Sequence, residues 1–364
     1  MKYLANVYKG KRVLITGDSG FKGSWLAIWL RQLGADVYGY SLAPKTNRDN
    51  FLTCCLSEKI HHVDGDIRDF GKLSEFINSI NPDVVFHLAA QPIVLESYSD
   101  PRYTFDTNVM GTVNVLEAVR LNKNIKAAVN VTSDKCYKNN EWLWGYRESD
   151  PMGGEDPYSA SKGASEIVTW AYLRSFFQKE DCASIASARA GNVIGGGDWA
   201  DFRIVPDFFR ALENKSSLVV RYPEATRPWQ HVLEPLGGYL LLGAKLLKEG
   251  KVYSGGWNFG PLDINNYSVR ELIEKLIEKS GKGSFDAPEM TDKKHEASLL
   301  KLDISKANGL LAWSPVLDFD QTIQFVVDGY LAEEKAARDI YDSRVNQIMS
   351  YMNIGAKKGF TYLQ

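Results

Sequence analysis

Residues 12–25 read RVLITGDSGFKGSW, and this stretch decides the fold. A short apolar run ends at Thr16, and Gly17, Gly20 and Gly23 follow in a G-x-x-G-x-x-G pattern before a helix-forming segment. Glycines let the backbone turn sharply and approach a pyrophosphate, while the start of a helix offers unpaired N–H groups and the positive end of its dipole. A strand, a glycine loop and a helix in this order therefore indicate a dinucleotide-binding unit.

Strand-like and helix-like segments alternate along the first half of the chain. Apolar runs such as DVYGYSL (36–42), DVVFHLA (83–89) and AAVNVTS (127–133) are separated by segments with apolar residues at helical spacing. This alternation predicts an α/β fold, a Rossmann-type doubly wound parallel sheet with its ligand at the carboxyl ends of the strands. After about residue 195 the alternation stops, which indicates a smaller mixed α/β C-terminal substrate domain.

The domain boundaries follow from this change of pattern. The segment LEPLGGYLLLGAKLLKEG has the length and apolar content of a helix that rejoins the first domain. We expect a dinucleotide-binding domain of residues 1–190 with a returning segment at about 231–254. We expect the substrate domain from residues 191–230 and 255–345, and a C-terminal tail at 346–364.

The composition excludes several classes of protein. The 364 residues include 43 basic and 45 acidic side chains, so there is no basic excess for binding nucleic acid or a membrane surface. No run of 18 apolar residues occurs, and the N-terminal segment lacks a signal-peptide core. The four cysteines have no C-x-x-C spacing, so neither a zinc site nor a disulfide framework is expected. These features predict a soluble cytoplasmic protein without a metal.

The end of the second strand bears on the choice of cofactor. Tyr40 and Ser41 stand where NAD enzymes usually carry an acidic residue for the ribose hydroxyls. The arginine that would favour NADP does not follow directly, although Lys45 and Arg48 lie a few residues beyond. We expect NAD, while the Tyr40 and Ser41 region alone does not distinguish NAD from NADP.

The next two strand ends are expected to complete the cofactor site. Asp66 and Ile67 follow the third strand, where they are predicted to hold the adenine. HLAAQ (87–91) ends the fourth strand beside the predicted positions of the pyrophosphate and the nicotinamide ribose. His87 in this run is expected to be structural.

Tyr158 and Lys162 form a candidate catalytic pair in YSASK (158–162). A spacing of four residues places both side chains on one face of a helix. An ammonium group near a phenol favours the phenolate and lowers its pKa, so Tyr158 is predicted to be the general base that accepts a proton from a sugar hydroxyl.

Polar residues after residue 190 are candidates for substrate binding. Asn192 is expected to donate to a diphosphate, and Arg203 and Arg227 carry guanidinium groups that bind phosphate bidentately. Stacking or hydrogen bonding to the base or sugar is predicted for Trp229, Gln230 and His231.

Seven motifs together resemble the extended short-chain dehydrogenase/reductase family, and within it the nucleotide-sugar 4,6-dehydratases. They are TGDSGFKG, HLAAQ, TNVMGTVNVLEA, VTSDKCY, YSASK, RAGNVIGGGDW and RPWQHV, and they span nearly the whole chain. The pairing of TSDKCY with TRPWQHV resembles the branch that acts on CDP-glucose. The dTDP-glucose branch carries Asp-Glu where this chain has Asp134 and Lys135.

The resemblance implies roles for the residues after the fifth strand. It assigns Asp134 as the acid at the C6 hydroxyl, Lys135 to the neighbourhood of C5, and Thr132 to the sugar O4. It also implies NAD as the cofactor, CDP-glucose as the substrate and a place in deoxysugar biosynthesis for the O-antigen of lipopolysaccharide. The further cofactor contacts that it implies are Phe21, Lys22, Leu88, Ala89, Ala90 and Asn108, and the further substrate contacts are Gln91 and Ser133.

Three alternative functions share parts of this pattern. Another nucleotide-sugar 4,6-dehydratase would keep the whole set of motifs. A 4-epimerase shares Tyr158, Lys162 and NAD, but it does not need the pair Asp134 and Lys135. A non-catalytic NAD-sensing regulator needs the glycine loop but not Tyr158 and Lys162. A homodimer or homotetramer is expected to form through the apolar helical segments 99–121 and 156–178, and the resemblance implies the same helices.

Overall fold

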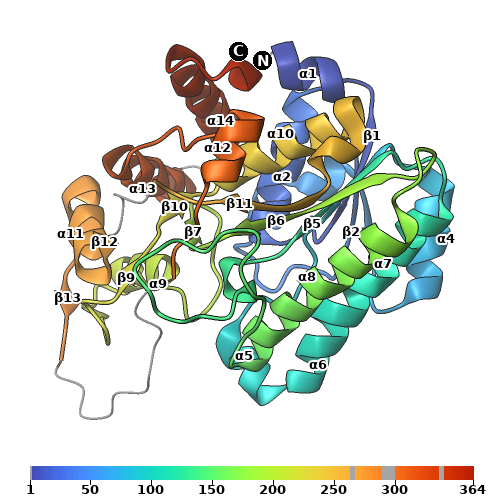
Figure 1. The fold of residues 1–364 in the computed structure, drawn as a ribbon. Helices are drawn as coiled ribbons and strands as arrows, with labels where there is room; N and C mark the ends of the chain where they lie inside the picture. The colour runs from blue at the N-terminus through green and yellow to red at the C-terminus, as the bar shows by residue number, and fades with distance from the viewer. Residues whose placement is uncertain (1, 263–266, 289–299, 336–339) are drawn as a thin grey trace.

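The computed structural model describes residues 2–262, 267–288, 300–335 and 340–364. Its centre is a parallel sheet of seven strands in the order β11-β6-β5-β4-β1-β2-β3 (Figure 1). The strands are β1 (Arg12–Thr16), β2 (Asp36–Ser41), β3 (His61–Asp64), β4 (Val84–His87), β5 (Ala127–Val131), β6 (Ser184–Ala190) and β11 (Gly255–Phe259). The predicted doubly wound parallel sheet is confirmed.

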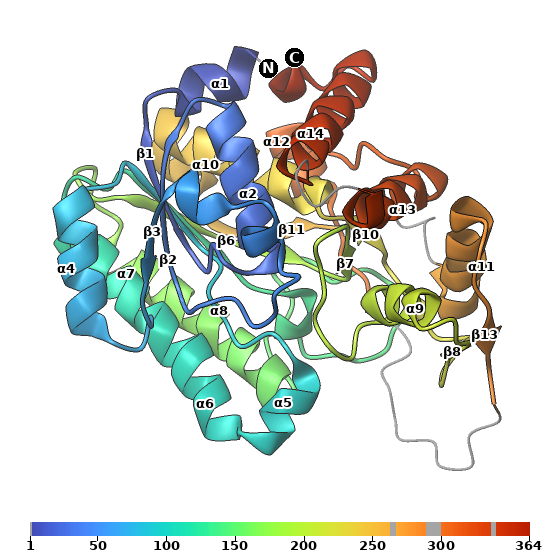
Figure 2. The same ribbon diagram turned by 180° about the vertical axis from the view of Figure 1, so that it is seen from behind.

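Helices cover both faces of this sheet. One face packs against α1 (Lys2–Tyr8), α2 (Phe21–Gln32), α10 (Leu233–Glu249) and α14 (Ile340–Lys357), and the other against α4 (Phe70–Ile80), α7 (Gly111–Leu121) and α8 (Pro157–Phe176) (Figures 1 and 2). All five residues of β5 are buried, because an apolar core lies on each side of the sheet. Shorter helices connect these elements: α3 (Asn50–Thr53), η1 (Leu56–Glu58), α5 (Val94–Ser99), α6 (Pro101–Phe105), η2 (Asp106–Met110), η3 (Asp134–Cys136), η4 (Gly250–Tyr253) and η5 (Thr361–Leu363).

The smaller part of the molecule has a mixed architecture and its own core. It contains α9 (Ile204–Glu213), α11 (Val269–Ser280) and α13 (Phe319–Lys335), which pack around apolar side chains such as Phe209, Ile273 and Val327. Short strand pairs join β7 (Val193–Ile194) to β10 (Gln230–His231), β9 (Thr226–Arg227) to β12 (Tyr267–Ser268), and β8 (Leu218–Val219) to β13 (Phe285–Asp286). The pair β9–β12 is antiparallel and the other two are parallel, which agrees with the mixed α/β expectation.

Three elements differ from the expected division of the chain. β11 falls within the predicted substrate segment 255–345, yet it pairs with β6 in the large sheet. α12 (Ser305–Leu311) packs against β11, and α14 packs against α2 of the large domain. The chain therefore returns to the large domain through α10 and β11, at α12, and again after α13, while the exact boundaries stay a prediction.

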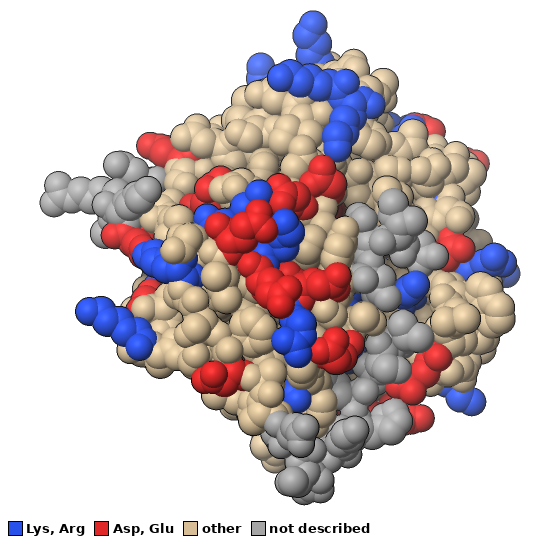
Figure 3. Space-filling model, turned by 90° about the vertical axis from the view of Figure 1, so that its left-hand side faces the viewer, with Lys and Arg blue, Asp and Glu red and all other residues tan. Residues whose placement is uncertain are grey.

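Surface charge is balanced on the face formed by the smaller domain. Acidic and basic side chains are interspersed among uncharged ones there, and Lys279 of α11 pairs with Asp320 of α13 at 2.7 Å (Figure 3). Within the described ranges, no helix has the length and apolar character needed to cross a membrane, and no three metal-binding side chains cluster together.

Candidate active site

The glycine loop has the close packing that a dinucleotide site requires. Gly17 has a φ of 79°, and a Cβ atom there would lie 2.6 Å from the Ala89 backbone nitrogen. A Cβ atom on Gly23 would lie 2.1 Å from the Gly17 carbonyl oxygen. The N-cap of α2 is Gly20, which offers no side-chain acceptor to the first turn of the helix. The backbone N–H groups in the first turn of α2 are therefore available to an anion, and the loop of Gly17, Gly20 and Gly23 fits the pyrophosphate of NAD.

The end of β2 is tied to this loop. The Ser19 backbone N–H donates to Ser41 Oγ at 3.3 Å, and the Ser19 hydroxyl donates to the Leu42 carbonyl oxygen at 2.8 Å. Tyr40 stacks on Phe76 and is buried, and its contact with the cofactor stays a prediction.

The residues after β3 also contribute mainly packing. Asp66 forms an ion pair with Arg68 at 2.6 Å. The hydrogen bond from Arg68 lowers the pKa of the Asp66 carboxyl and outweighs burial, which acts to raise it. Ile67 is buried in the core between the sheet and α4 and α7, where it occupies the space that a Cβ on Gly111 would need. The adenine contacts of Asp66 and Ile67 stay predictions.

Asn108 and Gln91 brace the segment that follows β4. Asn108 Oδ1 accepts from the Gln91 backbone N–H at 2.8 Å, and its Nδ2 donates to Ser161 Oγ of α8 at 2.8 Å. The Gln91 side chain donates to Thr104 Oγ1 at 2.9 Å and is buried, and its contact with substrate stays a prediction. These bonds hold the backbone of Leu88, Ala89 and Ala90 in place beside the glycine loop.

His87 is structural, as expected. Its Nδ1 lies 2.7 Å from the Thr16 hydroxyl, and burial lowers its pKa to about 3, so the ring is neutral. It joins the ends of β1 and β4.

Tyr158 and Lys162 lie in the first two turns of α8, both buried. The helix begins after Asp156, whose side chain accepts from the Ser159 N–H at 2.9 Å. Burial raises the pKa of Tyr158 to about 12, while the Ser133 hydroxyl and the charge of Arg203 act to lower it. Burial also lowers the pKa of Lys162 to about 8. Burial is therefore the largest influence on the pKa of Tyr158, and the lowering effect of Lys162 stays a prediction.

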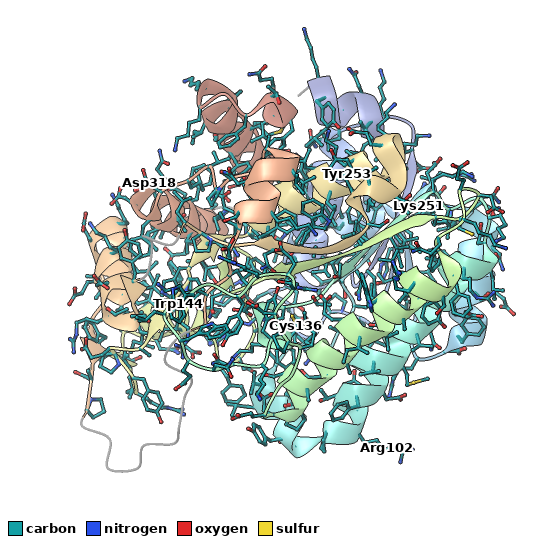
Figure 4. The ribbon with its side chains drawn as sticks, viewed as in Figure 1. Arg102, Cys136, Trp144, Lys251, Tyr253 and Asp318 are labelled. Carbon is teal, nitrogen blue, oxygen red and sulfur yellow. The ribbon has the colours of Figure 1, made fainter. Side chains whose placement is uncertain are left out.

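The segment that follows β5, residues 132–136, packs against α8, the helix that carries Tyr158 and Lys162. Cys136, which ends this segment, lies near the centre of the molecule beside α8 (Figure 4). Ser133 interacts with Tyr158 and donates to Asp134 Oδ1 at 2.9 Å. The Thr132 hydroxyl instead donates to Glu166. Thr132, predicted to bind the sugar O4, is thus turned to Glu166, and Ser133 is the hydroxyl beside the tyrosine.

Asp134 is a buried acid at the end of β5. Burial raises its pKa, while Lys135, the Ser133 hydroxyl and Lys22 partly oppose this effect. A Cβ atom on Gly191 would lie 2.8 Å from Asp134 Oδ2, so the glycine makes room for the carboxyl group. Lys135 is partly exposed and donates its backbone N–H to Ser133 Oγ at 3.2 Å.

Lys22 extends from the first turn of α2 into the same region. Its ammonium lies 3.5 Å from the Tyr239 hydroxyl of α10. Burial lowers its pKa to about 7, and the charges of Arg203 and Lys162 act in the same direction. Tyr239 was not predicted, because nothing near it in the sequence distinguishes it from the apolar residues of its helix.

Glu166 and Arg189 form a second unpredicted pair. Arg189 Nη2 of β6 lies 2.7 Å from Glu166 Oε2, and the Ser187 hydroxyl donates to the same oxygen at 2.6 Å. The position of Glu166 four residues after Lys162 is a signal that sequence reasoning could have used, since it shares the face of Tyr158 and Lys162.

Among the predicted substrate residues of the second half of the chain, Arg203 acts on the catalytic groups through its charge. It forms an ion pair with Asp198 at 2.8 Å, and its charge acts on both Tyr158 and Lys22. Asn192 is partly exposed between β6 and β7. Arg227 is also partly exposed, and its Nη1 donates to the Thr226 carbonyl oxygen at 2.8 Å.

Three side chains of the motif RPWQHV that are predicted to contact the substrate are buried, and these contacts stay predictions. Trp229, Gln230 and His231 are 7%, 2% and 0% exposed. Trp229 packs in the core of the smaller domain, and Gln230 donates to the Phe259 carbonyl oxygen at 3.1 Å. His231 lies between aromatic rings, and burial lowers its pKa to about 3. These side chains join the two parts of the molecule.

Comparisons with known proteins agree with this geometry. Residues 14–326 match the family model described as GDP-mannose 4,6 dehydratase. The chain is 46% identical over 352 residues to a CDP-glucose 4,6-dehydratase from Salmonella typhimurium, covering 96% of this chain and 98% of the relative. It is 28% identical to a CDP-paratose 2-epimerase from Salmonella typhi, covering 87% and 98% of the two chains.

Solved structures share the fold. A UDP-glucose 4-epimerase from Thermotoga maritima superposes with a TM-score of 0.76 at 20% identity, covering 89% of this chain and all of the other. A dTDP-glucose 4,6-dehydratase from Bacillus anthracis, solved in complex with NAD, gives a TM-score of 0.74 at 23% identity, covering 91% and 100%. The chain therefore belongs to the GDP-mannose 4,6-dehydratase family, within the extended short-chain dehydrogenase/reductase group of nucleotide-sugar dehydratases and epimerases.

Proposed function

We propose that the protein is an NAD-dependent CDP-glucose 4,6-dehydratase, a hydro-lyase that converts CDP-D-glucose to CDP-4-keto-6-deoxy-D-glucose and water. The observation that carries this proposal is the cluster of Tyr158, Ser133 and Asp134 at the end of β5. A 4-epimerase needs the tyrosine but not a buried acid next to it. The extensive identity to a CDP-glucose 4,6-dehydratase supports the same assignment.

The oxidation step uses Tyr158 and Ser133. NAD, held at the glycine loop, would supply the acceptor for the C4 hydride and the hydride that C6 receives later. Tyr158 accepts the proton of the C4 hydroxyl, and Ser133 replaces Thr132 as the proposed contact to O4. With a pKa of about 12 the phenol is almost entirely protonated near neutral pH and accepts the proton only as its minor phenolate form. The Ser133 contact and the Arg203 charge both lower that pKa and so raise the phenolate fraction.

The elimination step uses Asp134 and Lys135. Oxidation at C4 makes the C5 proton acidic. The C5 proton leaves, the C6–O bond breaks, and the departing hydroxyl takes a proton from Asp134 to leave as water. Burial raises the pKa of Asp134, which favours the protonated form that this step needs. Lys135 takes the C5 proton if it is neutral. If it is charged, it stabilises the developing enolate while the C5 proton passes to water.

The sequence of steps balances without an outside reductant. The sugar loses two electrons at C4 and gains them at C6, and C5 regains a proton after water has left. Arg203 and Asn192 are proposed to bind the diphosphate, because both are partly exposed beside this cluster.

We also propose a homo-oligomer formed through α6, η2, α7 and α8. Large apolar side chains on these helices are exposed, which favours burial against a second copy: Phe105, Met110, Leu121, Ile167, Trp170 and Phe176. Light scattering at micromolar concentration is expected to give a multiple of the 40.8 kDa chain mass. A single monomeric species would contradict this assignment.

The activity test is incubation of the purified protein with CDP-glucose. The expected product is a 4-keto-6-deoxy sugar nucleotide, which alkali converts to an absorbing chromophore and which mass spectrometry shows to have lost one water. Conversion to CDP-galactose without loss of water would instead identify a 4-epimerase.

A further inference from the structure

The loop of residues 42–49, between β2 and α3, is fastened across the cofactor crevice. It starts at the glycine loop, where the Ser19 hydroxyl donates to the Leu42 carbonyl oxygen at 2.8 Å. It then carries two cations, Lys45 and Arg48, which lie a few residues beyond the position where an arginine usually binds NADP. Each is engaged by a glutamate from a distant part of the chain.

Lys45 joins this loop to the helix that follows β4. Its ammonium lies 3.0 Å from Glu96 Oε2 of α5. In the sheet, β1 lies between β2 and β4. A contact from the segment after β2 to the helix after β4 therefore passes over the carboxyl end of β1, where the glycine loop lies. The loop thus spans the mouth of the pyrophosphate site.

Arg48 joins the same loop to the smaller domain. Its two terminal nitrogens lie 2.7 Å from the two carboxylate oxygens of Glu213 on α9, and its guanidinium lies 3.2 Å from the centre of the Trp199 ring. A bidentate pair combined with an aromatic face is a geometry that arginine alone provides. The β2–α3 segment runs toward α9 in the view from behind (Figure 2).

The surface that receives Arg48 is itself held in place. Trp199 Nε1 donates to Glu333 Oε2 at 2.7 Å, and Glu333 pairs with the buried Arg344. Arg344 Nε donates in turn to Asn50 Oδ1 at 2.9 Å, at the start of α3. The loop is therefore docked on a preorganised site and continues into an anchored helix.

We propose that Arg48, assisted by Lys45, is a positioning residue that retains NAD(H) by holding this loop closed over the crevice. The inference rests on the proposed function, because a dehydratase that returns its hydride to the same sugar must keep the cofactor through the whole cycle. The ion pairs are partly exposed, so the loop is able to open for cofactor exchange.

The test measures NADH release in the absence of any nucleotide sugar. Protein loaded with NADH is mixed with excess NAD in a stopped-flow instrument, and the loss of protein-bound NADH fluorescence gives the release rate. Arg48→Ala is expected to release NADH about tenfold faster than the unaltered protein, since it loses a bidentate ion pair and a cation–π contact. Arg48→Lys is expected to fall between the two, because it keeps the charge but not the planar fork.

Arg270→Ala is the matched control. Arg270 is an exposed arginine that pairs with Glu224 at 2.9 Å and lies over the Phe285 ring, in the smaller domain and away from the loop. The Arg270→Ala substitution should leave the rate of NADH release unchanged. A double-mutant cycle of Arg48→Ala with Glu213→Gln should show non-additive effects on the release rate, which a loss of general stability would not produce.

The outcomes separate this inference from the proposed function. Release from Arg48→Ala at the rate of Arg270→Ala would overturn the retaining role, whatever the dehydratase assay gives. Faster release from Arg48→Ala, together with no conversion of CDP-glucose by the unaltered protein, would support the retaining role and overturn the proposed function. A protein that binds no NADH would overturn both.

Discussion

The Thr132 hydroxyl donates a hydrogen bond to the carboxylate of Glu166, which fixes the end of β5 to α8 two turns beyond Tyr158. Glu166 also accepts from Ser187 and Arg189, and Arg189 Nη1 donates to the Tyr137 hydroxyl at 2.5 Å. Burial acts to raise the pKa of Glu166, but its hydrogen bonds and the Arg189 charge hold it below the usual value. Ser133 and Asp134 are thus presented to Tyr158 by a buried network behind them.

Thr132→Val is expected to affect mainly stability, and Ser133→Ala is expected to affect mainly kcat. Valine keeps the shape of Thr132 but removes one hydrogen bond, which should lower the free energy of unfolding by about 1 kcal/mol and reduce kcat by less than about tenfold. Ser133→Ala removes the hydroxyl beside Tyr158, and we expect a loss in kcat on the order of 100-fold with little change in stability. Urea unfolding and steady-state kinetics measure both. A larger loss in kcat from Thr132→Val than from Ser133→Ala would mean that Thr132, and not Ser133, contacts O4.

Tyr158→Phe is expected to abolish C4 oxidation while NAD still binds. The variant loses the phenol oxygen that accepts the O4 proton, and the glycine loop that holds the pyrophosphate is untouched. Removal of a general base typically costs about 10²–10⁴-fold in rate. Calorimetric titration with NAD and the dehydratase assay check the two parts. Turnover within a few-fold of the unaltered protein would mean that another group is the base.

Lys135→Ala is expected to block the elimination and not the oxidation. Bound NADH should form when CDP-glucose is added, with little 4-keto-6-deoxy product and slow entry of solvent deuterium at C5. Asp134→Asn, which lacks the proton for the departing hydroxyl, should also accumulate bound NADH but allow deuterium to enter at C5. Normal product formation and deuterium entry in Lys135→Ala would remove Lys135 from both proposed roles.

A preference for cytidine over thymidine is expected in the substrate. The expectation rests on the identity to a CDP-glucose 4,6-dehydratase and on the motifs TSDKCY and TRPWQHV. The measurement is kcat/KM for CDP-glucose and dTDP-glucose under the same conditions. Equal values for the two nucleotides would contradict the preference.

Stability should fall in acid because of His87 and His231. Burial lowers the pKa of each to about 3 from an ordinary value of 6.5, so between these values the unfolded chain binds more protons than the folded one. The stability that each neutral ring supplies is therefore complete above about pH 6.5 and lost as the pH falls toward about 3, at about 1.4 kcal/mol per pH unit for each histidine.

Urea unfolding between pH 7 and pH 4 tests this dependence. His231→Asn keeps an acceptor for the Leu233 N–H that His231 Nδ1 now binds, and it should flatten the curve. His61→Asn is the control, because His61 is exposed. An unchanged slope in His231→Asn would show that the His231 ring does not cause the acid sensitivity.

Local features of the sequence were enough to predict the sheet, the glycine loop and the catalytic helix. The spacing of Gly17, Gly20 and Gly23 reflects steric limits within one turn, and the structure confirms their close backbone contacts. Tyr158 and Lys162 lie on one face of α8 because four residues make about one helical turn. These properties depend on neighbours along the chain, so a sequence pattern contains them.

Only the tertiary structure decided which way the polar side chains point and how deeply they are buried. Thr132 and Ser133 are adjacent hydroxyl residues, and which one meets Tyr158 depends on how α8 packs against β5. Gln230 and His231 have the polarity of ligand contacts, yet they are buried where the two parts of the molecule meet. The pKa of Tyr158 depends more on its burial than on the lysine one turn away. Each of these outcomes requires elements far apart in the chain to come together, and residue spacing alone contains no information about that contact.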